Sequence, residues 1–391
     1  MGKGSRPGQM ILLILVLIFT SLFAAGCWDR RELNAISLVL ALGIDQEKDQ
    51  CKVSAQVVIP SSVKSKQSNN GNTVVVYTST APTLFEAIQK LSQTSPREIY
   101  ISQLRMLILG EEYARNGITE SVEMLTRHPS VRSDFFIAIA KEHRAEELLR
   151  VPSRLESVPA NSLYSNLLTT TDNWAVSAKV TVDKLAQQLA TEGVEPVLPA
   201  LELQQKDSRS PPLIKLTGLG VIKGDRLVGW LNEQESRGYN YIMNLVQSST
   251  GHVTFENNGL ISLRVLRTTT KKKVSLSKKT PVVHVRVKMI DTITEILRVP
   301  LDLSKPEEIA KLEKKCNERT IFVMRKAQDA AQRRFQADIF GFGKLIHETN
   351  PKAWKSMAQN WPALFPDVEV VYQVDNQVRR IGNTSESFIG K

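Results

Sequence analysis

Residues 36–59 read ISLVLALGIDQEKDQCKVSAQVVI, and this stretch indicates how the folded part of the chain begins. Ile36–Ile44 is an apolar run suited to a buried strand. Lys52–Ile59 alternates polar and apolar residues, which is typical of a half-buried strand. Together the two segments predict a sheet at the start of the folded chain.

Strands and helices alternate after this start. A polar loop is predicted between Ser61 and Asn72, followed by strands at Thr73–Thr80, Arg105–Leu109 and Phe135–Ala140. Helices are predicted after Pro82, where Thr83 and Glu86 have capping-box spacing, and at Ile118–Thr126, Ala145–Leu149 and Val180–Leu189. Such alternation favours an α/β or α+β layer.

The middle of the chain predicts a boundary between two large halves. Residues 151–171 are rich in Pro, Ser, Asn and Thr, and prolines and polar residues interrupt residues 191–212. We expect a signal peptide over 1–26, an N-terminal α/β domain over 27–197 and a C-terminal α/β region over 213–382. A division of the last region near 260–280, into a middle and a C-terminal domain, stays open. The predicted class is α+β, with two to three consecutive domains that are each a mixed sheet flanked by helices.

The second half opens with a predicted hairpin and helix. Leu216–Ile222 and Leu227–Leu231 flank a Gly-Asp turn, and Asn232 with Glu235 has capping-box spacing. The elements expected after them are strands at Leu260–Leu266 and Val282–Ile296, a long helix from Ser304 and Glu307 to about Phe335, and a last strand pair at Glu369–Val374 and Gln377–Ile381.

Lysines are dense between Lys271 and Lys279. We interpret this segment as a solvated hairpin tip, whose lysines discourage edge-to-edge pairing. Contact with anionic lipid or wall polymer is the alternative.

The first residues are typical of a secretory signal. Lys3 and Arg6 precede the apolar run Met10–Phe23, and Ala-Ala-Gly leads into Cys27. Small residues before a cysteine resemble the lipobox of bacterial lipoproteins, which predicts diacylglycerol, with or without an N-acyl chain, on Cys27. An ordinary signal peptide or an uncleaved anchor is the alternative. No other cofactor is expected.

The residues after Cys27 fit a membrane surface. Trp28 favours the membrane interface, and Arg30 and Arg31 would each contribute roughly 1 kcal/mol near anionic lipid. A solvated linker is the other interpretation of these three residues. The net charge of the 391-residue chain is +11, which in an exported protein suggests an anionic lipid surface, wall polymer or acidic partner sooner than nucleic acid.

The sequence offers no arrangement suited to catalysis. The five histidines lack metal-site spacing, and Gly341–Lys344 lacks the Ser or Thr that a phosphate loop requires. No Gly-x-Ser-x-Gly nucleophile elbow is present. Only Cys51 and Cys316 remain besides Cys27, and two buried free thiols are favoured over one bridge between them.

Three stretches in the right order resemble the Ger(x)C family, the lipoprotein C subunits of spore germinant receptors. They are GCWDRRELNAISLVLALGID (Gly26–Asp45), GLGVIKGDRLVGWLNEQESRGYNYIMN (Gly218–Asn244) and DIFGFGKLIHETNPKAWKSMAQNWPALFPDVEVVYQVDNQVRRIG (Asp338–Gly382). The resemblance covers nearly the whole mature chain.

The resemblance implies a non-catalytic subunit on the outer face of the spore inner membrane. It implies integral A-type and B-type membrane subunits as partners, a receptor that responds to nutrients, and three mixed α/β domains along the chain. The matching family positions, called here the family-motif positions, are Trp230, Glu235, Arg237, Gly238, Trp354 and Trp361. We expect them to pack and cap local structure, with direct subunit contact as the alternative.

Two other functions stay open from the sequence. A solute-binding lipoprotein of a transporter would have two lobes around a cleft. A wall-active enzyme would need a catalytic constellation, for which the chain offers no candidate.

Overall fold

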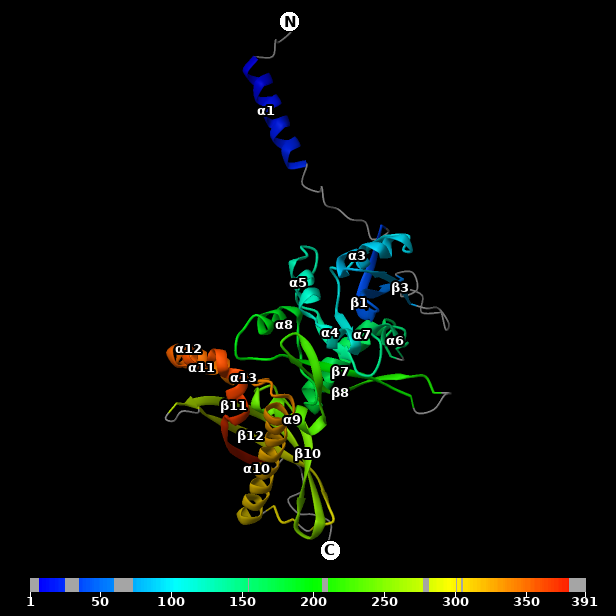
Figure 1. Ribbon diagram of the computed structural model, residues 1–391. Helices are drawn as coiled ribbons and strands as arrows, with labels where there is room; N and C mark the ends of the chain where they lie inside the picture. Colours follow the sequence, from blue (N-terminus) through cyan, green and yellow to red (C-terminus); the bar gives the residue numbers. More distant parts are fainter. Residues whose placement is uncertain are drawn as a thin grey trace.

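The computed structural model describes residues 7–24, 35–59, 73–153, 155–205, 210–276, 281–299, 301–303 and 305–379. These residues form two sheets with helices packed against them (Figure 1). Each sheet contains parallel and antiparallel strand pairs. The predicted α+β class with mixed sheets is therefore confirmed.

The first sheet has nine strands in the order β3-β2-β1-β5-β6-β7-β8-β9, with β4 also paired to β1. Its centre is parallel from β1 through β7, and antiparallel strands flank it on both sides. The strands are β1 (Ile36–Glu47), β2 (Gln50–Val58), β3 (Val74–Ala81), β4 (Glu98–Tyr100), β5 (Met106–Gly110), β6 (Phe136–Ala140), β7 (Val197–Gln204), β8 (Leu213–Lys223) and β9 (Arg226–Leu231).

Helices cover both faces of this sheet, which explains why its central strands are apolar throughout. In β5, Leu107 and Leu109 belong to one buried cluster while Met106 and Ile108 belong to another. Successive side chains of a strand point to opposite faces, so a strand buried on both sides needs apolar residues at every position. The helices of the first half are α3 (Leu84–Lys90), α4 (Glu111–Asn116), α5 (Thr119–Arg127), α6 (Ala145–Leu149), α7 (Pro159–Trp174) and α8 (Val182–Leu189).

The second sheet has the order β10-β11-β12-β13. A long helix, α10 (Pro306–Asp329), connects β12 to β13, which run parallel and so require a crossover. A π-helical turn, Ala330–Phe335, continues α10 to the predicted end of the long helix, whereas the predicted start at Ser304 lies outside the described residues. The strands of this sheet are β10 (Ser249–Phe255), β11 (Gly259–Ser275), β12 (Val282–Leu297) and β13 (Glu369–Arg379). The helices of the second half are α9 (Glu233–Ile242), α10, α11 (Phe342–Thr349), α12 (Pro351–Met357) and α13 (Trp361–Leu364). Short 3₁₀ turns lie along the described chain at Leu91–Gln93, Glu256–Asn258, Ala358–Asn360 and Phe365–Asp367.

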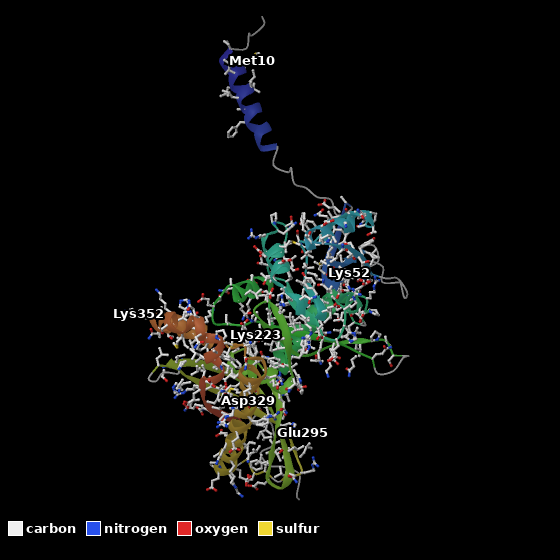
Figure 2. The ribbon with its side chains drawn as sticks, viewed as in Figure 1. Met10, Lys52, Lys223, Glu295, Asp329 and Lys352 are labelled. Atoms are coloured by element: carbon white, nitrogen blue, oxygen red, sulfur yellow. The ribbon has the colours of Figure 1, made fainter. Side chains whose placement is uncertain are left out.

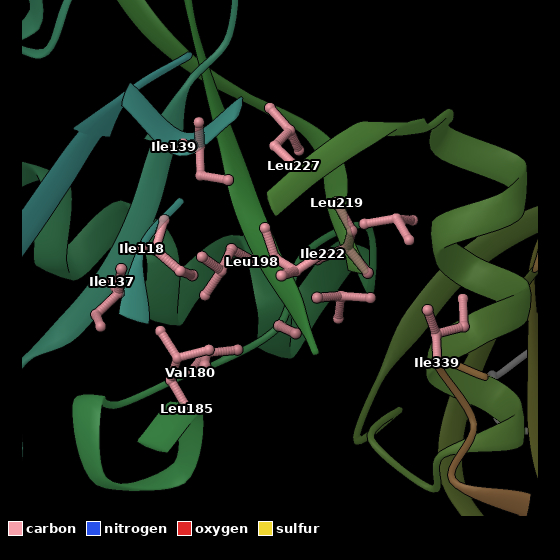
Figure 3. Packing of buried hydrophobic residues seen from close by; sticks show 14 of the residues in the cluster. Ile118, Ile137, Ile139, Val180, Leu185, Leu198, Leu219, Ile222, Leu227 and Ile339 are labelled. Atoms are coloured by element: carbon pink, nitrogen blue, oxygen red, sulfur yellow. The ribbon is translucent and has the colours of Figure 1, made fainter. Parts of the chain in front are cut away.

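One hydrophobic core runs from the first sheet into the second half. Its buried members include Leu219 and Ile222 of β8 together with Ile339 and Phe340, which follow the π-helical turn. Figure 3 shows Ile339 entering from the second half opposite the strands that carry Leu219 and Ile222. The two sheets therefore share buried apolar surface.

Regular structure occupies both of the polar intervals noted in the sequence. Helix α7 lies in the first, with Pro159 in its first turn and Leu163 and Leu167 buried one turn apart. Strand β7 lies in the second, where it pairs with β8 although it contains Pro199. The domain limits at 197 and 213 stay a prediction, but the first sheet continues across that interval.

The expected pair of strands at the end of the chain is wrong, because Glu369–Arg379 is a single strand parallel to β12. The Asp375-Asn376 dipeptide looks like a turn in the sequence. In the structure Asn376 is buried in the strand, and its side-chain amide donates a 2.7 Å hydrogen bond to the Asp291 carboxylate on β12. That bond replaces the local turn bonding to which Asn is otherwise prone.

The lysine-rich segment is also not simply a solvated tip. Lys271, Lys272 and Lys273 lie within β11, while residues 277–280 lie outside the described part. Lys272 points inward, and its ammonium donates a 2.9 Å hydrogen bond to the Phe340 carbonyl. Because side chains alternate along a strand, Lys271 and Lys273 are exposed.

Two further observations bear on the sequence predictions. Cys51 and Cys316 are buried free thiols, as favoured above. In the described part of the chain, which includes the exposed apolar helix α1 (Pro7–Ala24), no helix is at once long and apolar enough to cross a membrane.

Candidate functional site at the junction of the two sheets

Four of the six family-motif positions lie around α9, the helix that follows the first sheet. Asn232 begins this helix with the predicted capping box: its side chain accepts a bond from the Glu235 N–H, and Glu235 accepts one from the Asn232 N–H. Trp230 ends β9 immediately before the cap. The chain thus turns from the last strand of the first sheet into α9 at a fixed angle.

Arg334 connects this turn to the end of α10. Its guanidinium makes a bidentate pair with Glu235, at 3.1 and 2.7 Å, and donates a third bond of 3.1 Å to the Trp230 carbonyl. Glu235 is only 6% exposed, so loss of Arg334 would leave a buried carboxylate without its ion-pair partner. Arg334 belongs to the π-helical turn after α10, a feature often found at functional positions.

At Gly238 the backbone of α9 lies directly against α10. A Cβ atom at this position would lie 2.0 Å from the Val323 carbonyl oxygen. Only glycine leaves room for that carbonyl, so Gly238 sets the distance between the two helices.

Arg237 joins three elements on another face of α9. Its guanidinium lies 4.3 Å from the centre of the Trp174 ring at the end of α7. It also donates bonds of 2.9 Å to the Thr250 carbonyl on β10 and 3.1 Å to Glu233, which in turn accepts a bond from the Trp174 indole. Cation–π contact and ion pairing together hold α7 against the second sheet.

The other two family-motif positions, Trp354 and Trp361, pack on the start of α11. Their rings meet edge to face, with centres 5.5 Å apart, and both residues are buried. The Trp361 indole donates a 3.0 Å bond to Asp338, and the Trp354 indole donates a 3.2 Å bond to Glu192 in the first half of the chain. These two tryptophans therefore connect α11–α13 to both halves.

Asp338 is the buried acid at the centre of this second cluster. Its carboxylate accepts backbone bonds from Phe342 at 3.0 Å and Gly343 at 2.8 Å, as well as the bond from Trp361. Burial raises the pKa of Asp338 to about 6, against the lowering effect of these three donors and of nearby Lys272. Desolvation therefore outweighs hydrogen bonding at this carboxyl.

A short segment of the first half, Glu192–Glu195, docks directly onto Asp338 and α11. The Glu195 N–H donates to the Asp338 carbonyl at 2.9 Å, and the Lys344 N–H donates to the Gly193 carbonyl at 3.0 Å. Gly193 has a positive φ of 74°, and a Cβ there would lie 2.7 Å from the Gly343 carbonyl carbon. Glycine is thus required at Gly193 for conformation and for space.

A third contact across the junction comes from Lys223 at the end of β8, near the middle of the molecule (Figure 2). Its ammonium donates a 3.4 Å bond to the carbonyl of Phe335. Gly229 on β9 faces the same Phe335, since a Cβ there would lie 2.5 Å from the ring. The π-helical turn is thus held by β8, β9 and α9.

The predicted site residues therefore form two clusters rather than one. Trp230 and Glu235 meet at Arg334, while Trp354 and Trp361 meet at Asp338; Arg237 and Gly238 flank the first cluster. Cys27, Trp28, Arg30 and Arg31 lie outside the described residues. Among the residues that the structure describes, no three His, Cys, Asp or Glu side chains are grouped so that they could hold a metal ion.

Several residues that build the junction were not identified from the sequence. Asp338 opens the D-x-F-G-F-G stretch, so a signal for it was present. Arg334 and Gly193 carry no local signal, because their partners lie far away in the chain.

Comparison with known proteins gives matches along nearly the whole chain. Residues 29–203 match the family model described as spore germination protein N-terminal domain, and residues 217–382 match the one described as spore germination B3/GerAC like, C-terminal.

Two full-length relatives come from Bacillus subtilis (strain 168). Spore germination protein KC is 24% identical over 391 residues, which cover 95% of this chain and 96% of the relative. Spore germination protein B3 is 22% identical over 376 residues, covering 95% and 98% of the two chains. A solved structure, titled as the crystal structure of the GerBC protein, aligns with a TM-score of 0.58 and 17% identity over 86% of this chain and 96% of that chain. At this identity the structural likeness shows the fold alone.

The helix crossing at Gly238 makes a first prediction. Gly238→Ala should lower the free energy of unfolding by about 1–3 kcal/mol, because the new methyl group would overlap the Val323 carbonyl. An alanine in place of glycine inside a helix is otherwise favourable by about 1 kcal/mol. Urea unfolding measures the change, and Gln234→Ala, at an exposed position of the same helix, is the matched control. A variant as stable as the wild type would show that α9 and α10 are not in backbone contact.

Asp338 makes a second prediction, about pH. Its pKa is raised in the folded state, so folding retains a proton that the unfolded chain releases near pH 4. The stabilisation is therefore present below about pH 4 and is lost as the pH rises through about 6. A pKa difference of this size corresponds to roughly 3 kcal/mol.

The test is urea unfolding of the wild type and of Asp338→Asn between pH 4 and 7. The wild type should lose stability over this range relative to the variant, and Asp375→Asn, at an exposed position of β13, should keep the wild-type slope. Parallel pH profiles for the wild type and Asp338→Asn would refute a raised pKa at this carboxyl.

Proposed function

The chain belongs to the Ger(x)C family of spore germination proteins, and from this premise we propose that it is the non-catalytic, lipid-anchored C-type subunit of a nutrient germinant receptor. In this role it acts with an A-type and a B-type integral membrane subunit to trigger germination. The observation that carries the proposal is the match of both family models, in order, along almost the full length of the chain.

The length over which the relatives align supports the proposal. Spore germination proteins KC and B3 each align over at least 95% of this chain and of their own length. The similarity therefore extends over whole proteins and is not limited to one shared domain.

The roles of the family-motif residues also support a non-catalytic function. Trp354 and Trp361 are buried, Glu235 is paired with Arg334, and Gly238 allows α9 to contact α10. Each of these residues fixes how the two sheets lie against each other. A subunit that passes a change of state between partners needs such a fixed relation between its surfaces.

We further propose that residues 1–26 are a signal peptide and that Cys27 carries diacylglycerol. Two acyl chains give stable membrane attachment, whereas one chain gives only reversible binding. Trp28, Arg30 and Arg31 would then lie at the surface of the outer face of the spore inner membrane. Removal of residues 1–26 takes away Lys3 and Arg6 and lowers the net charge from +11 to +9, which still favours that anionic surface.

The test is co-purification from detergent-solubilised spore membranes with an affinity tag at the C-terminus. The wild type should bring down two multi-spanning membrane proteins in fixed ratio to itself, identified by mass spectrometry. Recovery of the tagged chain without them would overturn the receptor assignment.

Cys27→Ala serves as the matched control for the anchor, because it removes only the thiol that would be lipidated. It should carry no lipid at position 27, whereas mass spectrometry of the wild type should find diacylglycerol on Cys27. An unmodified Cys27 thiol in the wild type would contradict the lipid anchor while leaving subunit assembly to the co-purification result.

A further inference from the structure

An open cleft lies between α9, α10 and β10, away from Asp338 and its contacts. Its walls include Trp174 and Phe322, which are 43% and 51% exposed, and its floor includes Arg237 and Arg319. A small inner cavity of about 50 Å³ adjoins the same two arginines. The two hollows thus meet at a pair of guanidinium groups.

The guanidinium of Arg319 has N–H donors that no acceptor among the described residues uses. Among the described residues it makes no hydrogen bond or ion pair, although burial is sufficient to lower its pKa. Its guanidinium lies along the backbone of β10, because a Cβ at Gly251 would be only 3.0 Å from one of its nitrogens. Glycine at this position therefore leaves room for a charged group that has no counterion.

Arg237 is close enough to Arg319 for their charges to repel. Burial lowers the pKa of Arg237, Glu233 opposes that effect, and the positive charge of Arg319 lowers the pKa further. Its terminal nitrogens donate to Thr250 and Glu233, but its Nε is buried without an acceptor. An anion bound at Arg319 would offset the repulsion between the two guanidinium groups.

The inner cavity fixes which end of a ligand could enter. Its walls include Val253, Leu263 and Met289, and it also borders Asp291, whose Oδ1 is buried without a partner. A carboxyl group at that end disfavours a second negative charge, and the walls favour an apolar group. A ligand would therefore place its charge at the arginines and its apolar part inside.

The charged side chains at the rim of the cleft restrict which kind of anion could bind. Glu233 and Glu318 border the cleft with side chains that are 53% and 52% exposed, and Lys315, which also borders it, pairs with Glu318 at 3.5 Å. These carboxylates repel a doubly charged phosphate more than a singly charged carboxylate. The planar fork of a guanidinium can bind either anion in two parallel bonds, so the preference for a carboxylate rests on the charge of the rim.

We propose that this cleft binds a small monocarboxylate, whose carboxylate pairs with the guanidinium of Arg319 beside Arg237 and whose short apolar tail enters the inner cavity. The ligand is a small organic acid with a tail of two or three carbons. This inference does not depend on the receptor assignment, because it concerns binding by the single chain.

The test is saturation-transfer NMR of n-butyrate with the full chain in nonionic detergent. Butyrate should bind saturably and roughly tenfold more tightly than acetate, since two more CH₂ groups are buried. Inorganic phosphate should not compete. Absence of saturable butyrate binding, or equal competition by phosphate, would overturn the proposal.

Substitutions of Arg319 test whether its guanidinium binds the carboxylate. Arg319→Met keeps the length of the side chain but removes the charge, and it should weaken butyrate binding by about tenfold or more. Arg325→Met, at an exposed position of the same helix, should leave the affinity unchanged. If Arg319→Met fails to fold, Arg319→Lys against Arg325→Lys gives the same comparison with the charge retained and the fork lost. Equal affinities within each pair would refute the site.

Discussion

The relation between the two sheets depends on the buried carboxyl group of Asp338. It receives hydrogen bonds from Phe342, Gly343 and Trp361, and its own carbonyl accepts one from Glu195 in the first half of the chain. Desolvation makes a charge at this carboxyl costly, so its donors must stay in place. The docking of Glu192–Glu195, the start of α11 and the packing of the two tryptophans all follow from this position. Arg334 with Glu235 provides a second, separate connection through the end of α10.

These two connections hold the two halves of the molecule in a fixed relation. The family-motif residues hold elements together and so fix how the surfaces of the two halves lie. A germination subunit built in this way would present both halves to its membrane partners as one unit. The cleft at Arg237 and Arg319 lies on a different side of α9 from the Glu235–Arg334 pair, so a ligand there would contact the same helix that carries Glu235.

The fold was predictable wherever local pattern decides structure. The apolar runs of β1, β5 and β6, the hairpin β8–β9 and the capping box at Asn232 and Glu235 follow from periodicity and side-chain chemistry over a few residues. The errors arise where a distant partner decides. Asn376 remains in a strand because Asp291, 85 residues away, accepts its amide bond, and Lys272 turns inward because the Phe340 carbonyl is available. The residues of the candidate site were likewise predicted only in part. The family resemblance identified Trp361 and Glu235. It did not identify Arg334, whose partner Glu235 is 99 residues away.

Differential scanning calorimetry of the full chain tests most directly whether the junction joins the two sheets into one cooperative unit. The account predicts a single transition over the folded residues, with equal calorimetric and van't Hoff enthalpies. Two resolved transitions, with enthalpies that match residues 29–203 and 217–382 melting separately, would contradict it.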